Sequence, residues 1–390
     1  MLGNARPRVD RNVLAVSSAM FLLSLGENLW KNFLPKYLQA LGAPIRAIGL
    51  YGSVEDFLDG IYQYPGGWLG DRLGRRNALV AFVSLALIGY VLYAVGGSWV
   101  WALVAVVFAM AWTSMASPTL FAVVGDALPP ERRALGFTVQ AILRRLPILV
   151  APIAGGIVIA RAGLLRGMHL LFLATILCGV ATLFVVMRVR IDRIAGPPAN
   201  IRGVWQAFPA GLRRLLISDV FIRTSQGLVD EFAVIYAMSV IGVSALQYGM
   251  LISVQTIVSI AVYFPAAAIA DRIGRKPFVI ATFLAFSFFP AAIVMSSGLG
   301  GLVLAFVVGG LREIGEPSRK ALIVDFAPPA LRARTVGLYY LVRSVAIAPA
   351  AFVGGLLWEV RPTLPFVISL VVGLIGTAVF ALTHDGSVRT

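Results

Sequence analysis

Cysteine and histidine are almost absent from this chain of 390 residues, which contains one cysteine and two histidines. A single cysteine, Cys178, excludes an intrachain disulfide, and two histidines speak against a zinc site. The sequence also has no Ser/His/Asp set and no glycine-rich nucleotide loop. It therefore gives no basis for an enzyme, and we expect neither a cofactor nor a bound metal.

Charged residues are scarce as well, because Asp, Glu, Lys and Arg make up 13% of the chain while 59% of it is hydrophobic. Soluble domains carry about 25% charged residues. A chain this apolar needs lipid as its solvent, so the bilayer is its first expected partner.

Acidic residues are the scarcer of the two signs, since 18 Asp and Glu stand against 33 Lys and Arg, for a net charge of +15. In a soluble protein such a charge would suit nucleic acid. Here the arginines form short clusters between apolar runs instead of one folded face. The membrane surface explains them, and we expect no nucleic-acid partner.

Long apolar runs fill most of the chain. A run of about 20 residues is long enough to cross a bilayer as a helix. Twelve such runs are found, at residues 12–36, 46–70, 77–96, 99–125, 135–160, 168–187, 215–241, 246–270, 277–298, 300–325, 335–358 and 362–383. They predict an all-α integral membrane protein with twelve transmembrane helices.

The basic clusters indicate which connections face the cytoplasm, because Lys and Arg in short loops are retained there. Such clusters precede the first run and follow the second, fourth, eighth and tenth. Both termini are therefore expected in the cytoplasm, with the chain in a bacterial inner (plasma) membrane. Residues 188–214 are polar and rich in arginine, which predicts a cytoplasmic linker between an N-terminal bundle, 1–187, and a C-terminal bundle, 215–390.

One short polar stretch occurs twice. Residues 66–76 read GGWLGDRLGRR, and residues 266–276 read AAAIADRIGRK. Glycines, prolines and charges around the two copies match at a nearly constant offset, as Pro65 matches Pro265. So many matches indicate an internal duplication, and hence two halves of similar fold.

The first copy resembles the Gly-x-Leu-x-Asp-Arg-x-Gly-Arg-Arg signature of the major facilitator superfamily, and the second is a degenerate form of it. The residues that carry the resemblance are Gly67, Leu69, Asp71, Arg72, Gly74, Arg75 and Arg76. The resemblance covers essentially the whole chain and is greatest to the twelve-helix drug/proton antiporter branch. It implies two pseudo-symmetric six-helix bundles, a central cavity lined mainly by helices 1, 4, 7 and 10, and alternating access by rocking.

The duplicated stretch is a candidate conformational latch. Glycine allows a tight turn and a close helix approach, and Asp71 can bind a helix N-terminus or an arginine in one conformation and lose it in the other. The latch residues are expected to be Gly67, Gly70, Asp71, Arg72, Gly74, Arg75, Arg76, Asp271, Arg272, Gly274 and Arg275. The alternative is a basic loop that only fixes orientation.

Residues 151–156, APIAGG, resemble the Gly-Pro-x-x-Gly-Gly element of the proton-coupled drug exporters in this superfamily. Ala151 stands in place of the first glycine, and Pro147 departs from the upstream pattern. The same small residues could equally serve ordinary helix packing.

Ionisable side chains are unusually numerous inside the predicted helices. Each costs on the order of 3 kcal/mol at membrane depth, so each calls for a partner, water or a function. The candidates for proton coupling or substrate binding are Glu27, Asp56, Asp59, Arg144, Asp230, Glu231, Arg312, Glu313, Glu316 and Arg343. Because helices 2 and 11 meet across the halves of the resembled architecture, we expect an Asp59 to Arg343 bridge in one access state only.

Proton coupling requires a buried carboxylate, since desolvation favours its neutral form. Glu27 is the first candidate, because Lys31 is its only neighbour of opposite sign along the helix. The alternative is a static pair between Glu27 and Lys31, which lie one turn apart.

Two further pairs are interpreted from helical spacing. Asp230 and Glu231 are adjacent and face different directions, so only one of them is expected to reach the cavity. Arg312 lies one turn from Glu316, and Glu316 lies one turn from Arg319 or Lys320, which could make the tenth helix an internally paired network.

Three functions stay open. The first is a proton-coupled exporter of amphiphilic or drug-like small molecules, acting as a monomer. The second is a transporter of an organic anion, such as a carboxylate, a phosphate, a lipid or a siderophore-like metabolite, bound by Arg144, Arg145, Arg312 and Arg343. The third is a non-transporting membrane sensor or a membrane-embedded enzyme.

Overall fold

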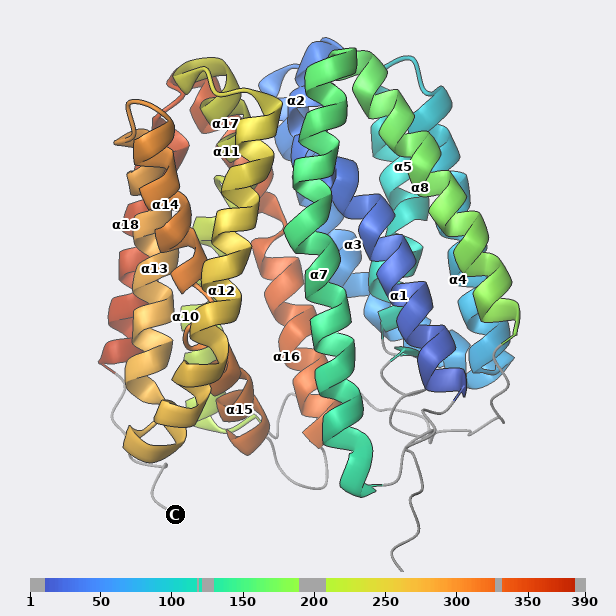
Figure 1. Cartoon of the computed structure of the whole chain (residues 1–390). Coiled ribbons are helices and arrows are strands. Elements are labelled where there is room, and N and C mark those ends of the chain that lie inside the picture. The colour runs from blue at the N-terminus through green and yellow to red at the C-terminus, as the bar shows by residue number, and fades with distance from the viewer. Residues whose placement is uncertain (1–10, 118, 121–129, 189–207, 327–331, 383–390) are drawn as a thin grey trace, which may run out of the picture.

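The chain folds into helices arranged in two halves that stand side by side, as a computed structural model shows (Figure 1). The structure describes residues 11–117, 119–120, 130–188, 208–326 and 332–382, and within them it contains no strand. For a smaller set it describes the backbone alone, namely residues 11–13, 64, 71, 130–144, 264, 267, 271 and 332–334.

The first half makes six passages across the bundle. Its first passage is interrupted by a short 3-10 helix, and its fourth continues into a π-helical segment. In chain order the elements are α1 (Arg11–Trp30), η1 (Lys31–Phe33), α2 (Leu34–Ala40), α3 (Ile45–Leu73), α4 (Arg75–Val95), α5 (Trp99–Met110), η2 (Ala111–Met115), α7 (Pro130–Ala162) and α8 (Leu164–Met187).

The second half repeats this plan with six more passages, of which the first, the fourth and the fifth are each built from more than one helix. Its elements are α10 (Ala210–Gly227), α11 (Asp230–Ile235), η3 (Tyr236–Ile241), α12 (Ala245–Ile273), α13 (Lys276–Val294), α14 (Leu299–Leu311), α15 (Glu316–Phe326), α16 (Arg332–Ile347), α17 (Pro349–Val360) and α18 (Leu364–Ala381). The predicted all-α fold of two six-helix bundles is confirmed.

Several boundaries differ from those predicted. Helix α10 begins at Ala210, inside the stretch 188–214 that was assigned to the linker, because the exposed Arg213 and Arg214 extend the helix beyond its apolar run. The predicted helix at 300–325 is two helices, α14 and α15, separated by a turn. Most of the predicted linker, residues 189–207, lies outside the described residues.

The duplication is visible in the backbone of α3 and α12. Each helix has 29 residues, carries one internal proline, Pro65 or Pro265, and ends at a glycine. Those glycines, Gly74 and Gly274, have φ of 81° and 100°. Such positive values favour glycine strongly, because a Cβ would clash there. We call the end of the bundle where these glycines lie the hinge end, and the end where α3 and α12 begin the opposite end.

A matching pair of glycines packs helices together inside each half. A Cβ on Gly155 of α7 would lie 1.9 Å from the carbonyl oxygen of Leu29, and one on Gly354 of α17 would lie 2.3 Å from that of Leu228. No side chain fits in either space. The predicted small-residue element of α7 therefore serves helix packing, with an equivalent in the second half.

The next glycine in each pair packs across the two halves. A Cβ on Gly156 would lie 2.6 Å from the carbonyl oxygen of Ala245, and one on Gly355 would lie 2.9 Å from the Cα of Arg46. Ala245 and Arg46 belong to the first turns of α12 and α3. The halves are thus pressed together at the opposite end, along the contacts of α7 with α12 and of α3 with α17.

Seven of the described helices are long and apolar enough to cross a membrane on their own. They belong to the third, fifth, sixth, eighth, ninth, eleventh and twelfth passages. The other five passages are interrupted by a break or carry several charges, as α3 does at Glu55, Asp56 and Asp59. Four of these five, the first, second, seventh and tenth, supply the charged residues of the central site described below.

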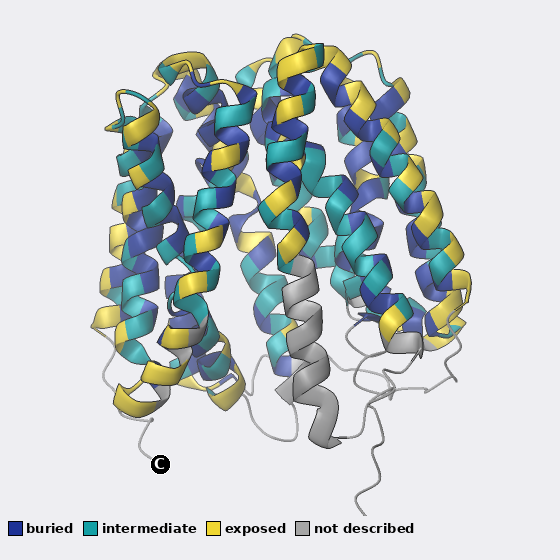
Figure 2. Ribbon diagram, in the orientation of Figure 1, coloured by how far each residue is buried: buried dark blue, intermediate teal, exposed yellow. Residues whose placement is uncertain are grey.

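The outer surface of the bundle suits a lipid environment. Large apolar side chains are exposed on helices around the whole bundle, where exposed and partly buried residues alternate with buried ones (Figure 2). Examples are Val95, Leu177, Phe184, Leu304 and Val371. A soluble monomer rarely exposes so much contiguous apolar surface.

Candidate functional site

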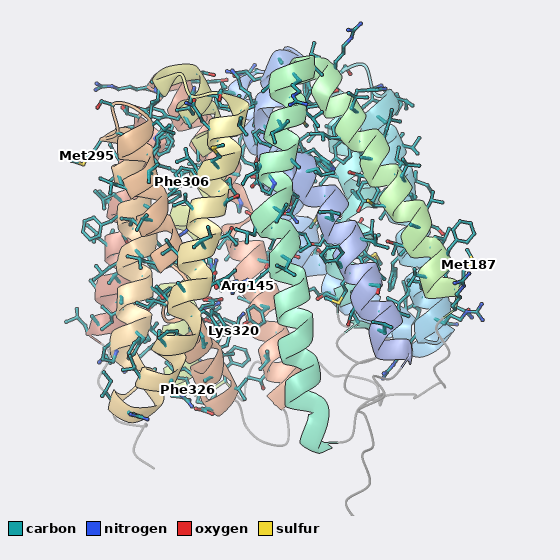
Figure 3. All side chains as sticks on the ribbon, in the orientation of Figure 1. Arg145, Met187, Met295, Phe306, Lys320 and Phe326 are labelled. Carbon is teal, nitrogen blue, oxygen red and sulfur yellow. The ribbon has the colours of Figure 1, made fainter. Side chains whose placement is uncertain are left out.

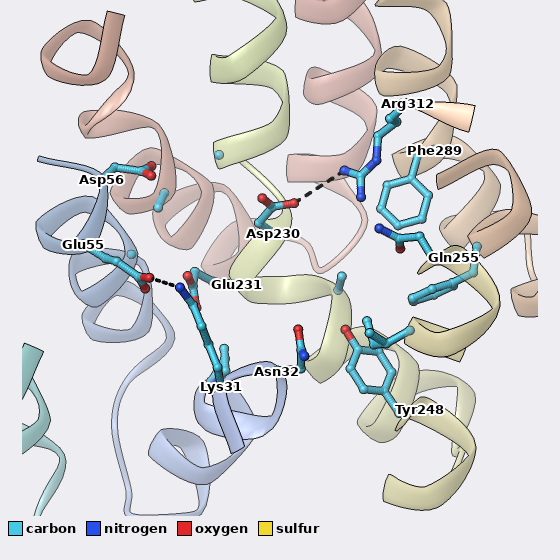
Figure 4. Close-up of a pocket in the computed structure, with 17 residues that line it drawn as sticks. Lys31, Asn32, Glu55, Asp56, Asp230, Glu231, Tyr248, Gln255, Phe289 and Arg312 are labelled. Carbon is cyan, nitrogen blue, oxygen red and sulfur yellow. Dashed lines mark hydrogen bonds and ion pairs between the residues drawn. The ribbon is translucent and has the colours of Figure 1, made fainter. Parts of the chain in front are cut away.

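A cavity of about 350 Å³ lies between the two halves (Figure 4). Its walls come from the first and second passages of the first half and from α11, α12, α13, α14 and α17 of the second. The polar and aromatic residues that line it include Lys31, Asn32, Glu55, Asp56, Asp230, Glu231, Tyr248, Gln255, Phe289, Phe306 and Arg312. We call this space the central cavity.

A break in the seventh passage places two acids in the central cavity. Helix α10 ends at Gly227 and α11 restarts at Asp230, so the helical phase changes between them. Both Asp230 and Glu231 line the cavity as a result. The expectation that only one of them would reach it is wrong, because it assumed one continuous helix.

Carboxylates outnumber cationic groups in the central cavity. Its lining contains four acids, Glu55, Asp56, Asp230 and Glu231, and two bases, Lys31 and Arg312. Lys31 Nζ lies 2.5 Å from Glu55 Oε1, and Arg312 Nη1 lies 4.0 Å from Asp230 Oδ1. Gln226 also donates a hydrogen bond to Asp230 at 2.6 Å.

The other two acids of this cavity, Asp56 and Glu231, form no such pair. Among the described residues, neither Asp56 nor Glu231 has an ion-pair or hydrogen-bond partner. Glu231 lies directly over the backbone of α3, where a Cβ on Gly52 would be 2.7 Å from its Cγ. An acid of the second half therefore sits against a helix of the first half at the centre of the molecule.

Aromatic side chains form the wall of the central cavity on the side of the second half. Tyr248 packs edge-on against Phe306, with ring centroids 5.8 Å apart, and Phe306 packs edge-on against Phe289 at 5.5 Å. The guanidinium of Arg312 lies 4.5 Å from the centre of the Phe289 ring, and its Nε donates to the carbonyl oxygen of Gly309. Arg312 is thus held by the wall as well as by Asp230.

A second cavity of about 210 Å³ lies inside the first half. It is bordered by α1, η1, η2 and α7, and its lining includes Glu27, Asn28, Lys31, Trp112 and Thr113. The hydroxyl of Tyr90 donates to Glu27 Oε1 at 2.5 Å. Glu27, the first candidate for proton coupling, therefore belongs to this second cavity, while Lys31 lines both cavities and pairs with Glu55.

A buried ion cluster occupies the second half toward the hinge end. Arg319 Nη1 donates to Asp219 Oδ2 at 2.6 Å, and Arg319 also donates twice to Glu316. Arg343 Nη1 lies 3.5 Å from Asp219 Oδ2, and Arg223 Nη2 lies 3.4 Å from Glu316 Oε1. Sequence reasoning missed Asp219 and Arg223, although opposite charges one turn apart inside an apolar run were a usable signal.

Part of the pairing predicted for the tenth passage is present, because Glu316 pairs with Arg319 and with Lys320. Arg312 and Glu316 lie one turn apart in sequence, but α14 ends at Leu311 and α15 begins at Glu316. This break places Arg312 in the central cavity and Glu316 in the ion cluster with Arg319. The proposed network thus forms around Glu316 without Arg312.

Asp59 and Arg343 have separate partners in this conformation. Ser114 donates to Asp59 Oδ1 at 2.7 Å, while Arg343 faces Asp219. Their helices are neighbours nevertheless, because a Cβ on Gly60 of α3 would lie 2.5 Å from the Cβ of Ser344 on α16.

One ion pair joins the two halves on the hinge side of the central cavity. Arg145 of α7, labelled in Figure 3, donates to Glu313 Oε2 at 3.1 Å, and its guanidinium lies 4.7 Å from the ring centre of Tyr263 on α12. The side chain of its neighbour Arg144 lies outside the described residues.

The first copy of the duplicated stretch packs closely at the hinge end. A Cβ on Gly70 would lie 2.4 Å from Thr119 Oγ1, so glycine lets α3 approach the fourth passage. The guanidinium of Arg72 lies over the ring of Trp68 at 5.0 Å, and Arg75 is buried at the start of α4.

The second copy shows an ion pair between Arg275 and Asp325. The side chains of Asp71 and Asp271, on which the latch hypothesis depends, lie outside the described residues. The other members of the two copies are exposed or partly buried, namely Gly67, Arg76 and Arg272.

The sequence matches a known family of membrane transport proteins along most of its length. The sequence model of the Major Facilitator Superfamily matches residues 16–241 and 215–388. The chain is 20% identical over 388 residues to an uncharacterized MFS-type transporter of Methanocaldococcus jannaschii, covering 94% of this chain and 93% of that protein. It is 28% identical over 153 residues to a Na(+), Li(+), K(+)/H(+) antiporter of Planococcus maritimus, covering 38% of this chain and 36% of that protein.

Solved structures of transporters share the fold. A POT family transporter in complex with 5-aminolevulinic acid matches with a TM-score of 0.79 at 15% identity, covering 96% of this chain and 95% of that one. At this identity the likeness shows the fold alone.

Proposed function

We propose, on the premise that the chain belongs to the Major Facilitator Superfamily, that it exchanges protons for amphiphilic small molecules by alternating access. It is a multi-pass membrane transporter rather than an enzyme. The observation that carries the proposal is the central cavity, where four carboxylates face two cationic groups beside an aromatic wall. An apolar body fits such a wall, and the excess carboxylates can carry protons.

The two acids without partners are the proposed proton carriers. A carboxylate at membrane depth without an ion-pair or hydrogen-bond partner is costly when ionised, so it takes up or gives off a proton as its surroundings change. Asp56 belongs to the first half and Glu231 to the second. Rocking of the halves changes the distance between them, which would couple protonation to the access state.

The glycine contacts between the halves support a state of this conformation in which the central cavity is closed at the opposite end. Gly156 and Gly355 press the halves together at the opposite end, which shuts the central cavity on that side. Parting these contacts, with closure of the hinge end, would give the other state. We propose that Asp59 and Arg343 meet across the halves in that second state, and that the duplicated stretches act as its latch.

The basic residues suggest how the chain is oriented in the membrane, and the proton gradient then suggests the direction of transport. The basic residues Arg72, Arg75 and Arg76 lie at the hinge end, which we therefore place in the cytoplasm, with both termini, across a bacterial inner membrane. Entry of protons down their gradient would then drive the cargo outward. We propose that the chain acts as a monomer of two bundles, 1–187 and 215–390.

Two other cargoes are weaker candidates. Organic anions would need unpaired arginines, whereas Arg343 faces Asp219, Arg145 pairs with Glu313, and Arg312 lies near Asp230. An alkali cation is the other candidate cargo. The acidic cavity supports it, and so does the partial match to the Planococcus protein, whose name is that of an alkali cation/proton antiporter. The aromatic wall argues for an organic cargo instead.

Reconstituted vesicles with an internal pH dye test the proposal. A proton gradient is imposed, and Na⁺, K⁺, neutral, cationic and anionic aromatic compounds are added in turn. We expect proton movement with organic compounds, and none in the Asp56→Asn/Glu231→Gln double variant. Proton movement with Na⁺ or K⁺ alone would show that the cargo is an alkali cation and not an organic compound. Binding of a compound without any flux of protons or of the compound would favour a sensor.

A further inference from the structure

Lys31 places an ammonium group inside the acidic central cavity. Its Nζ lies 2.5 Å from Glu55 Oε1, and half of the Lys31 side chain is accessible, at 50%, against 16% for Glu55. Figure 4 shows the Lys31 side chain reaching up between Glu55 and Glu231. The chain thus fills, with its own amine, the part of the cavity where acids gather.

We propose that Lys31 is a built-in competitor for the cargo, which is an organic cation. The position of Lys31 Nζ marks the subsite for the cationic group of the cargo, and cargo binding displaces Lys31 from Glu55. This inference rests on the proposed function and assigns a charge to its cargo.

The surroundings of this subsite fit such an ion on both sides. Glu55 and Glu231 supply the carboxylates that a cationic group requires (Figure 4). Across the cavity, Tyr248 and Phe306 present the aromatic wall, and a cation with an apolar body can lie between them and the acids. A cavity of about 350 Å³ accommodates a small drug-sized molecule.

A second acid is in reach of the displaced lysine. Lys31 lines the second cavity as well as the central one, and that second cavity contains Glu27, one helical turn before Lys31. The four-carbon stem of lysine is flexible, so its ammonium can pass from Glu55 toward Glu27 without a change of backbone. Glu27 is held in place for this role by the hydroxyl of Tyr90.

The exchange moves two positive groups in opposite directions. The cationic group of the cargo enters the central cavity while the ammonium of Lys31 leaves it toward the second cavity. The return of Lys31 to Glu55 then expels the cargo when the cavity opens to the other side. A lysine at this place therefore weakens binding but favours release, which a transporter needs.

Binding of a fluorescent cation to the purified full-length protein tests the inference. The probes are ethidium, a planar aromatic cation, and phenanthridine, a neutral compound with the same ring system. In the Lys31→Gln variant we expect the Kd for ethidium to fall about tenfold, because a like charge is removed from the subsite, while that for phenanthridine stays within about twofold. Energised ethidium export from vesicles should fall in the same variant.

Two further variants complete the test. Lys36→Gln is the matched control, since Lys36 contacts Gln39 and Ser239 at the opposite end and should leave ethidium binding unchanged. Glu27→Gln removes the acid toward which the displaced Lys31 moves, so it should raise the Kd for ethidium. This variant still tests the inference if Lys31→Gln does not fold. Unchanged or weaker ethidium binding in a folded Lys31→Gln variant overturns the inference about Lys31 but not the proposed function. An unchanged Kd for ethidium in Glu27→Gln has the same meaning. Absence of ethidium binding to the wild type, with proton-coupled flux of uncharged or anionic compounds, overturns it as well and spares the proposed function.

Discussion

Asp219 and Arg319 form an ion pair sealed inside the second half. Their side chains are 0% and 2% accessible, and Arg319 Nη1 donates to Asp219 Oδ2 at 2.6 Å. Tyr339 donates to the same oxygen at 3.1 Å, and Arg343 approaches it at 3.5 Å. A single carboxylate thus holds together α10, α15 and α16, which belong to three different passages.

Replacing this carboxylate should destabilise the protein strongly. In Asp219→Ala, Arg319 loses one of its two acidic partners at a buried site, and removing one partner of such a pair costs about 3–5 kcal/mol. We expect a large fall in the melting temperature of the protein in detergent. The matched control is Asp325→Asn, whose exposed side chain pairs with Arg275 and should cost at most about 1 kcal/mol. Equal melting temperatures for the two variants would contradict the role of Asp219.

Glu231 should be needed for proton exchange at the central cavity. If an organic cation displaces a proton from this carboxylate, adding the cation to unbuffered protein releases protons, and Glu231→Gln should release markedly fewer. A pH indicator dye measures the release directly. Glu359→Gln is the control, because Glu359 lies 3.9 Å from Arg46 at the opposite end and away from the cavity. Wild-type release in Glu231→Gln would exclude this residue as a proton carrier.

Ser114 should bias the access equilibrium through Asp59. Its hydrogen bond to Asp59 exists in the present conformation, and a typical hydrogen bond contributes about 1 kcal/mol. Ser114→Ala should therefore shift the population toward the state in which Asp59 meets Arg343. Spin labels at the exposed Leu73 and Ile273, the last residues of α3 and α12, should then report shorter distances.

The control for this shift is Thr113→Ala, in the neighbouring position, whose hydroxyl contacts the sulfur of Met110. It should leave the label distances unchanged. If Ser114→Ala gave the same distances as the wild type, the hydrogen bond to Asp59 would have no part in the equilibrium.

Gly156 should limit how closely the halves approach at the opposite end. A methyl group there would lie 2.6 Å from the carbonyl oxygen of Ala245, so Gly156→Ala must push α7 away from α12. We expect slower transport and wider label distances at the opposite end. The same substitution at Gly337, where nothing lies within 4 Å, should be neutral or slightly stabilising. Transport at the wild-type rate in Gly156→Ala would show that the contact is dispensable.

The features that sequence reasoning predicted well are those carried by local patterns. The duplicated stretch predicted two equivalent hinges, and Gly74 and Gly274 do adopt the same left-handed backbone. Apolar runs predicted the passages, and the cost of a charge at membrane depth pointed to Asp56 and Glu231, which line the central cavity while their role stays a prediction.

The features that it missed depend on breaks that apolar runs conceal. The signals of these breaks are short stretches inside the predicted runs: residues 223–227 read RTSQG at the end of α10, and residues 312–317 read REIGEP after α14. Each break changes the direction of every later side chain, which brings Asp230 into the cavity and separates Arg312 from Glu316. Pairing over long sequence separations, as between Asp219 and Arg319, could not be read from local spacing at all.

The five passages with breaks or charges have a consequence for biogenesis. As α3 leaves the translocon, three carboxylates oppose its entry into lipid at about 3 kcal/mol each on insertion scales. The hydroxyl that binds Asp59 belongs to Ser114, two passages later, and the guanidinium that binds Asp219 belongs to Arg319, three passages later. Stable integration of each half must therefore wait until its fourth helix has been synthesised, so nascent chains truncated before Ser114 or before Arg319 should be extracted by alkali far more readily than longer ones.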